Sequence, residues 1–79
     1  MTSIEERIVK DINIFKKNIK EIDKEKIDPK QRKVIELAEM YASDSQAFLE
    51  KKDYYTSFSS IAYAHGLLDS IRKLNGKSD

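Results

Sequence analysis

The sequence predicts an all-α protein in which three helices, at about residues 3–24, 29–51 and 54–74, run up, down and up in a bundle. Three observations lead to this fold class. Apolar residues recur at steps of three and four along most of the chain, which is the period of a helix. A residue that can cap a helix precedes each segment. The 79 residues include only one Pro and two Gly, and a chain of this length is expected to form one domain over residues 1–79.

The first helix is predicted over residues 3–24. Ser3 and Glu6 have the spacing of a capping box, in which each side chain accepts a hydrogen bond from the other residue's backbone amide. The apolar residues that follow fall within about 80° on a helical wheel, a stripe narrow enough for one face of a bundle. This stripe consists of Ile4, Ile8, Ile12, Phe15, Ile19 and Ile22.

The second helix is predicted over residues 29–51. Asp28 is a suitable N-cap, Pro29 suits the first helical position, and Gln31 has the spacing that completes a capping box. The side chains expected to point inward share one sector of the wheel, and an apolar flank adjoins it. The inward residues are Val34, Leu37, Ala38, Tyr41, Ser45 and Phe48, and the flank is Ile35, Ala42 and Leu49.

The third helix is predicted over residues 54–74, with Asp53 as its N-cap and Asn75-Gly76 as its end. One continuous helix over residues 29–74 is the alternative. We favour the break, because a continuous helix would leave much apolar surface without a partner.

The apolar arc of the third helix covers more than half of its circumference, which is wider than a bundle core needs. The surplus is expected at Tyr63, Leu67 and Leu74. A contact with a protein partner or a second copy of the chain would account for it. Isolated apolar residues on the surface are the alternative explanation.

Polar residues are expected to form a seam between the second and third helices. His65 and Asp69 are one helical turn apart, and an antiparallel hairpin places Tyr41 roughly opposite His65. A histidine with carboxylates can hold a metal or a small ligand, but a structural His–Asp pair is the better interpretation. Gly66 is attributed to close helix packing, and room for a ligand is the alternative. The residues of the seam are Tyr41, Asp44, Ser45, Tyr63, His65 and Asp69.

The charges are distributed unevenly along the chain. Residues 16–33 hold eight Lys and Arg against four acidic residues, whereas residues 36–69 hold six acidic residues against two Lys. The basic stretch is expected to form one pole of the bundle and to offer an anion-binding surface. Its candidate residues are Lys26, Lys30 and Lys33. Solvated helix faces explain the pattern equally well.

Several classes of function are disfavoured by what the sequence lacks. It has no Cys, no glycine-rich phosphate loop and no Ser with a paired base, so we expect no catalytic residue, no metal and no cofactor. No apolar run is long enough for a membrane span, and the first residues do not form a secretory signal. The expected location is the cytoplasm.

A continuous block of the chain resembles the archaeal domain-of-unknown-function family 357. The block runs from Tyr41 to Tyr54 and continues through Phe58 and residues 61–69. The resemblance implies a small cytosolic three-helix bundle, an accessory module with no assigned activity. It also marks a set of signature residues without giving them roles: Tyr41, Asp44, Ser45, Asp53, Tyr63, His65, Gly66 and Asp69.

The sequence leaves three functions open. We favour a non-enzymatic module that binds a protein, because of the wide apolar arc of the third helix. The second is binding of nucleic acid or nucleotides through the basic pole at residues 16–33. The third is a small-ligand or metal site in the polar seam.

Overall fold

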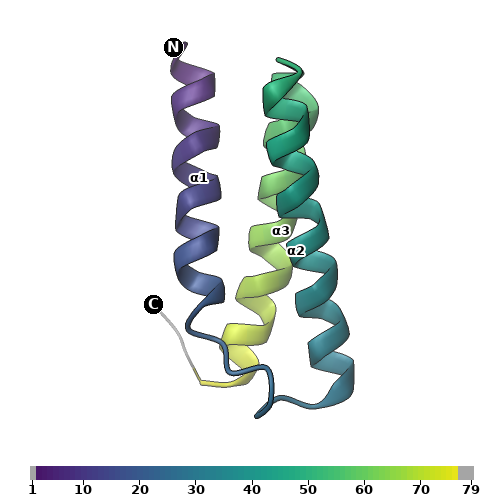
Figure 1. Ribbon diagram of the computed structural model, residues 1–79. Coiled ribbons are helices and arrows are strands. Elements are labelled where there is room, and N and C mark those ends of the chain that lie inside the picture. The colour runs from purple at the N-terminus through teal and green to yellow at the C-terminus, as the bar shows by residue number, and fades with distance from the viewer. Residues whose placement is uncertain (1, 77–79) are drawn as a thin grey trace.

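The computed structural model describes residues 2–76, in which the chain forms three helices: α1 (Ser3–Ile19), α2 (Pro29–Glu50) and α3 (Tyr54–Leu74). They run up, down and up (Figure 1), and the α1–α2 connection lies at the same end of the bundle as the end of α3. The predicted fold class is confirmed. The predicted bounds of the third helix agree with the structure, and the second helix ends one residue earlier than expected.

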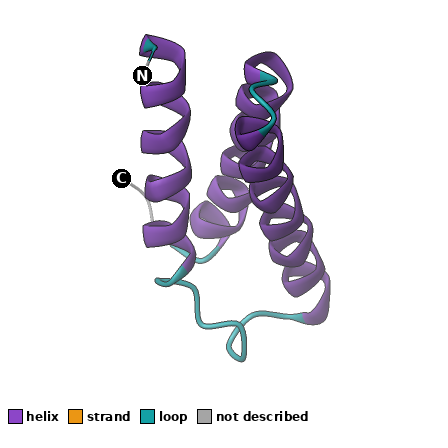
Figure 2. Cartoon of the chain, turned by 45° about the horizontal axis from the view of Figure 1, so that its top comes forward, coloured by secondary structure: helices purple, strands orange, loops and turns teal. Residues whose placement is uncertain are grey.

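The three helices do not pack equally. α2 and α3 contact each other along their length, whereas α1 packs mainly on α3 and only lightly on α2. Figure 2 accordingly shows α1 standing to one side of the α2–α3 hairpin. The buried apolar core that joins them comes from all three helices and from the α1–α2 connection: Ile8, Ile12, Phe15, Ile27, Ile35, Ala38, Ile61, Ala64, Leu68 and Ile71.

The capping box of α1 lies one residue earlier than predicted. Thr2, not Ser3, is the N-cap: its hydroxyl accepts a hydrogen bond from the Glu5 amide at 3.2 Å, and Glu5 accepts one from the Thr2 amide at 3.2 Å. The hydrogen bond from the Thr2 amide, with a further one from Tyr54, holds the pKa of Glu5 below its usual value. Two overlapping boxes are possible in this sequence, and in the observed one the Glu5 carboxylate also accepts a hydrogen bond from Tyr54 of α3.

The prediction that the first helix extends to Lys24 is wrong, because α1 ends at Ile19. The chain leaves the helix through tight turns, in which the Ile22 amide donates to the Ile19 carbonyl at 3.2 Å. The connection then buries Ile27, which is only 8% exposed, against the core, and packs Ile22 there from outside the helix. A longer helix would leave too few residues to cross to α2 and still bury Ile27.

The start of α2 confirms one half of its predicted cap. The Gln31 amide donates to Asp28 Oδ1 at 2.8 Å, and Pro29 occupies the first turn. The other half of the predicted box is wrong. The Gln31 side chain instead accepts a hydrogen bond from Asn75 Nδ2 at 3.2 Å, which ties the start of α2 to the end of α3.

The inward face of α2 is rotated from its predicted position. Ile35, expected on the flank, is fully buried with Ala38 and Ser45, whereas Leu37, expected to point inward, is 38% exposed. The cause is α1, which lies over the Ile35 side of α2 and therefore turns the buried sector toward it. The wheel of α2 alone contains no information about where α1 lies.

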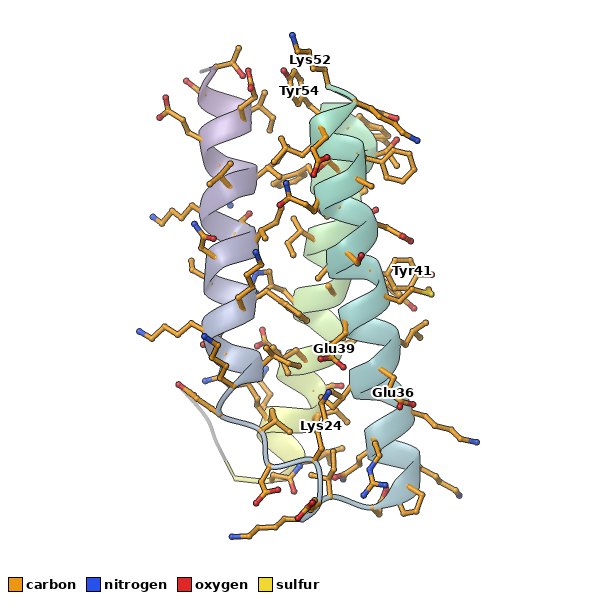
Figure 3. The ribbon with its side chains drawn as sticks, viewed as in Figure 1. Lys24, Glu36, Glu39, Tyr41, Lys52 and Tyr54 are labelled. Atoms are coloured by element: carbon orange, nitrogen blue, oxygen red, sulfur yellow. The ribbon has the colours of Figure 1, made fainter. Side chains whose placement is uncertain are left out.

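The break between α2 and α3 is confirmed. Lys52, labelled at the tip of the hairpin in Figure 3, adopts a left-handed backbone with φ of 63°. The Asp53 amide donates to the Phe48 carbonyl at 2.9 Å, and the Asp53 side chain accepts from the Thr56 amide at 3.2 Å. These bonds close one helix and start the next within a tight turn. At the other end of α3, Gly76 has a φ of 77°, which fits its predicted role as a helix stop.

Candidate functional site

A buried pair of serines sets the register of the α2–α3 hairpin. Ser45 and Ser57 are fully buried, and each hydroxyl donates to the other residue's carbonyl oxygen at 2.7 Å. The two hydroxyl oxygens are 3.1 Å apart. Small residues allow the helix backbones to approach closely, and the reciprocal bonds satisfy both buried hydroxyls. Every pairing of side chains across α2 and α3 follows from this register.

The two tyrosines of the predicted seam do meet. The rings of Tyr41 and Tyr63 are arranged edge to face, with centroids 4.7 Å apart and planes at 79°. Tyr63 is 52% exposed, and Figure 3 shows Tyr41 on the edge of α2 that faces away from α1. The prediction that Tyr41 lies opposite His65 is wrong, because in the Ser45–Ser57 register the ring of Tyr41 contacts Tyr63, and His65 faces α1.

His65 faces α1, not α2. Its Nε2 is 2.8 Å from the Asp11 carbonyl oxygen, and its ring lies edge to face with Phe15 at 5.8 Å between centroids. The predicted bond between His65 and Asp69 is not formed, since Asp69 pairs with Arg72 at 3.5 Å. His65 thus joins α3 to α1 as a half-buried structural contact.

The six residues of the predicted seam therefore lie in different places. Tyr41 and Tyr63 form one contact, Ser45 is buried in the hairpin, and His65 packs on α1. Asp44 is exposed on α2, and Asp69 belongs to the ion pair with Arg72. Within residues 2–76, no three His, Cys, Asp or Glu side chains gather closely enough to hold a metal ion. None of the described helices is long and apolar enough to cross a membrane.

Gly66 lies on the solvent side of α3. A Cβ atom built at this position would meet no other atom within 4 Å. The expectation that close helix packing explains this glycine is therefore wrong. Gly66 is destabilising relative to alanine at a helix interior position, and no neighbouring helix approaches closely enough to require it.

Replacing this glycine is expected to stabilise the protein. Gly66→Ala should raise the free energy of unfolding by about 1 kcal/mol, because alanine restricts the unfolded backbone and favours the helix interior. Urea denaturation followed by circular dichroism measures the change. Ala62→Gly, at another exposed position of the same helix, is the reverse control and should lower stability by a similar amount. A loss of stability in Gly66→Ala would contradict the open environment of Gly66.

One face of the hairpin is left uncovered by α1. On α3, His65 and Phe58 point toward α1, where His65 meets Asp11 and Phe58 lies under the Arg7 guanidinium at 5.8 Å. On a helical wheel the residues Tyr63, Leu67 and Leu74 fall within about 40° of each other and about 180° from His65.

The wheel of α2 agrees with that of α3. Glu39 is on the α1 side, where it pairs with Lys24 of the connection at 2.8 Å. Leu37 and Tyr41 lie about 160–200° from Glu39, and Figure 3 shows Glu39 and Tyr41 on opposite sides of α2. We call the surface away from α1 the outer face; it consists of Leu37 and Tyr41 of α2 and Tyr63, Leu67 and Leu74 of α3.

The outer face is apolar and partly exposed. Leu74 is 71% exposed, Tyr63 52% and Leu37 38%, while Tyr41 and Leu67 are half-buried. Met40, 49% exposed, lies at its edge. The exposure of Tyr63 and Leu74 agrees with the sequence prediction, whereas Leu67 is half-buried and packs against the core. The sequence prediction missed Leu37 and Met40. The missing signal was the position of α1, which decides which apolar residues of α2 are covered.

The basic pole is partly neutralised within the bundle. Lys24 pairs with Glu39, and the Arg32 guanidinium donates to the Lys24 carbonyl at 3.0 and 3.2 Å. Lys26 Nζ is 3.9 Å from Asp23. The predicted anion-binding residues Lys26, Lys30 and Lys33 are all exposed. Anion binding at this pole stays a prediction.

A family model described as "Protein of unknown function (DUF357)" matches residues 10–76. This match confirms the resemblance inferred from the α2–α3 block and extends it over the second half of α1. No curated protein matches the chain.

Proposed function

We propose that this chain, which belongs to the family of proteins of unknown function DUF357, is a non-enzymatic module that binds a protein through its outer face. One observation carries the proposal: α1 packs on one side of the α2–α3 hairpin, and the opposite side presents apolar and aromatic side chains to solvent. Contiguous apolar surface of this kind marks interaction sites on small proteins.

The composition of α3 supports this interpretation. In the whole chain 37% of the residues are charged, yet residues 54–68 include no Asp, Glu, Lys or Arg. About half of the helix surface over residues 54–68 does not face the core. If solubility were the only requirement, charged residues would be favoured on that side. Interfaces are depleted of charged residues in their centres and enriched in tyrosine.

The tyrosine pair gives the outer face a rigid centre. The edge-to-face contact between Tyr41 and Tyr63 restrains both rings before any partner binds. A side chain that is already ordered loses less conformational entropy on binding. Further burial of Leu74 and Tyr63 would then contribute up to roughly 1.5–3 kcal/mol for each side chain.

Site-specific crosslinking tests the proposal. We expect a photoreactive phenylalanine analogue in place of Tyr63 to yield a protein adduct when the chain is expressed in its native cells. The same analogue in place of Tyr55 is the matched control, because Tyr55 is on the same helix and 81% exposed but lies about 80° from Tyr63 on the wheel. Denaturing gels and mass spectrometry measure the yield and identity of the adducts.

Only an adduct specific to position 63 supports the outer face as a binding surface. Equal yields at positions 63 and 55 would reflect random encounters, and no adduct at position 63 would mean that the outer face meets no protein. Either result would overturn the proposed function.

A further inference from the structure

We propose that the occupant of the outer face is a second copy of this chain, packed with its α2 antiparallel to the α2 of the first. This inference rests on the proposed function and names the partner of the same face. The argument depends on the charges at the two ends of the face, the symmetry that they match, and the area available.

The outer side of α2 is basic at one end and acidic at the other. Lys33 and Asp44 are both exposed, and on the helical wheel they fall in the same sector of about 80° as Leu37 and Tyr41. The apolar residues lie between these two charges along α2. Lys33 and Asp44 are about 16 Å apart along the helix axis at 1.5 Å per residue.

A two-fold axis that lies between the two α2 helices, perpendicular to both, makes this pattern of charges self-complementary. With the axis midway between Leu37 and Met40, Lys33 of each copy lies opposite Asp44 of the other, so that two ion pairs form together. Isologous interfaces have this reciprocity, in which residue i contacts residue j and j contacts i. A parallel stacking of α2 on α2 would oppose Lys33 to Lys33 and Asp44 to Asp44, which electrostatic repulsion disfavours.

The α3 helices meet on the same axis. The Ser45–Ser57 register places Tyr63 opposite residue 39 of α2, within about 1 Å of the axis along the helix at 1.5 Å per residue. The two Tyr63 side chains therefore come together at the centre of the pair, with Leu67 on either side. Residues 54–68 of α3 include no Asp, Glu, Lys or Arg, so this part of the helix brings no charged side chain into the contact. The α2–α3 hairpins of the two copies therefore stack face to face as four helices, with each α1 on the far side of its own hairpin.

The area suffices for a reversible dimer. The bundle is 38 Å long and 22 Å wide. α3 has 21 residues, or about 32 Å at 1.5 Å per residue. An overlap of the two hairpins about 27 Å long and 20 Å wide would bury roughly 1,000 Å² in total from two copies, at the lower limit for a specific protein interface. The formal net charge of only +1 adds little repulsion between copies.

Sedimentation equilibrium of the purified chain and a charge swap test the inference. We expect the chain to dimerise. Lys33→Asp and Asp44→Lys should each weaken dimerisation about tenfold, because each turns two attractive pairs into two repulsive ones. Combining Lys33→Asp with Asp44→Lys in one chain should restore the affinity to within about threefold, with the charges exchanged. Lys10→Asp, an exposed charge reversal on α1, changes the net charge equally and should leave dimerisation unaffected.

The outcomes separate this inference from the proposed function. A chain that sediments as a monomer at about 1 mM, while the crosslink at position 63 captures a different protein, overturns self-association and leaves the proposed function intact. A dimer that the combined charge swap fails to restore overturns the antiparallel arrangement. A dimer that is restored by the swap, with the crosslink joining two copies of this chain, supports both.

Discussion

Leu68→Ala is expected to lower the free energy of unfolding by about 2–5 kcal/mol. Leu68 of α3 is fully buried in the core of the bundle, in the same cluster as Ile61 and Ala64. Its truncation therefore removes apolar contacts and leaves a cavity. Native domains are stable by roughly 0.05–0.15 kcal/mol per residue, or about 4–12 kcal/mol for a chain of this size. The substitution thus removes a large fraction of the total stability.

Leu74→Ala is the matched control, since it changes the same residue type on the same helix. Leu74 is 71% exposed, and its truncation should alter stability by less than about 0.5 kcal/mol. Urea denaturation followed by circular dichroism at low micromolar concentration measures both variants. Equal effects at positions 68 and 74 would show that the helix is rotated from its described orientation. Leu74→Ala is also expected to weaken binding at the outer face.

Ser57→Leu is expected to destabilise the protein by roughly 2–4 kcal/mol. The larger side chain must force α2 and α3 apart, and overpacking of this kind costs about 1–3 kcal/mol. It also removes the hydrogen bond that the Ser57 hydroxyl donates to the Ser45 carbonyl oxygen, which contributes about 1 kcal/mol. Thermal or urea unfolding measures the loss.

Ser59→Leu provides the control for this prediction. Ser59 lies two residues away on the exposed side of α3, where its hydroxyl bonds only the Tyr55 carbonyl at 2.9 Å. Leucine there meets solvent and not α2, so stability should change by less than about 0.5 kcal/mol. If Ser57→Leu were tolerated as well as Ser59→Leu, the two serines would not hold the register of the hairpin. The Tyr41–Tyr63 contact would then lack its support.

The starts of the helices were largely predictable because capping is local. Asp28 and Asp53 each accept the amide hydrogen bond that their positions in the sequence imply. The cap of α1 shows the limit of such reasoning. Thr2 and Ser3 offer equivalent chemistry, and the contact of Glu5 with Tyr54 on another helix accompanies the observed choice.

The candidate site was predictable only where a single helix determines it. The exposure of Tyr63 and Leu74 could be recognised from the wheel of α3, because the apolar arc of that helix is wider than a three-helix bundle core needs. Leu37 was misplaced, and His65 was assigned to the wrong neighbour, because both depend on where α1 lies. A helical wheel gives the angles between side chains and not the direction of the next helix.

The sequence by itself determined the number of helices, the caps at Asp28 and Asp53, the break near residue 53 and the family of the chain. Tertiary structure alone decided the end of α1 at Ile19, the pairing of Tyr41 with Tyr63 and the side of the hairpin that α1 covers. The physical reason is the range of the interactions. Caps and periodicity depend on residues within one helical turn, whereas burial of Ile27 and the Ser45–Ser57 bonds join residues that are distant in sequence.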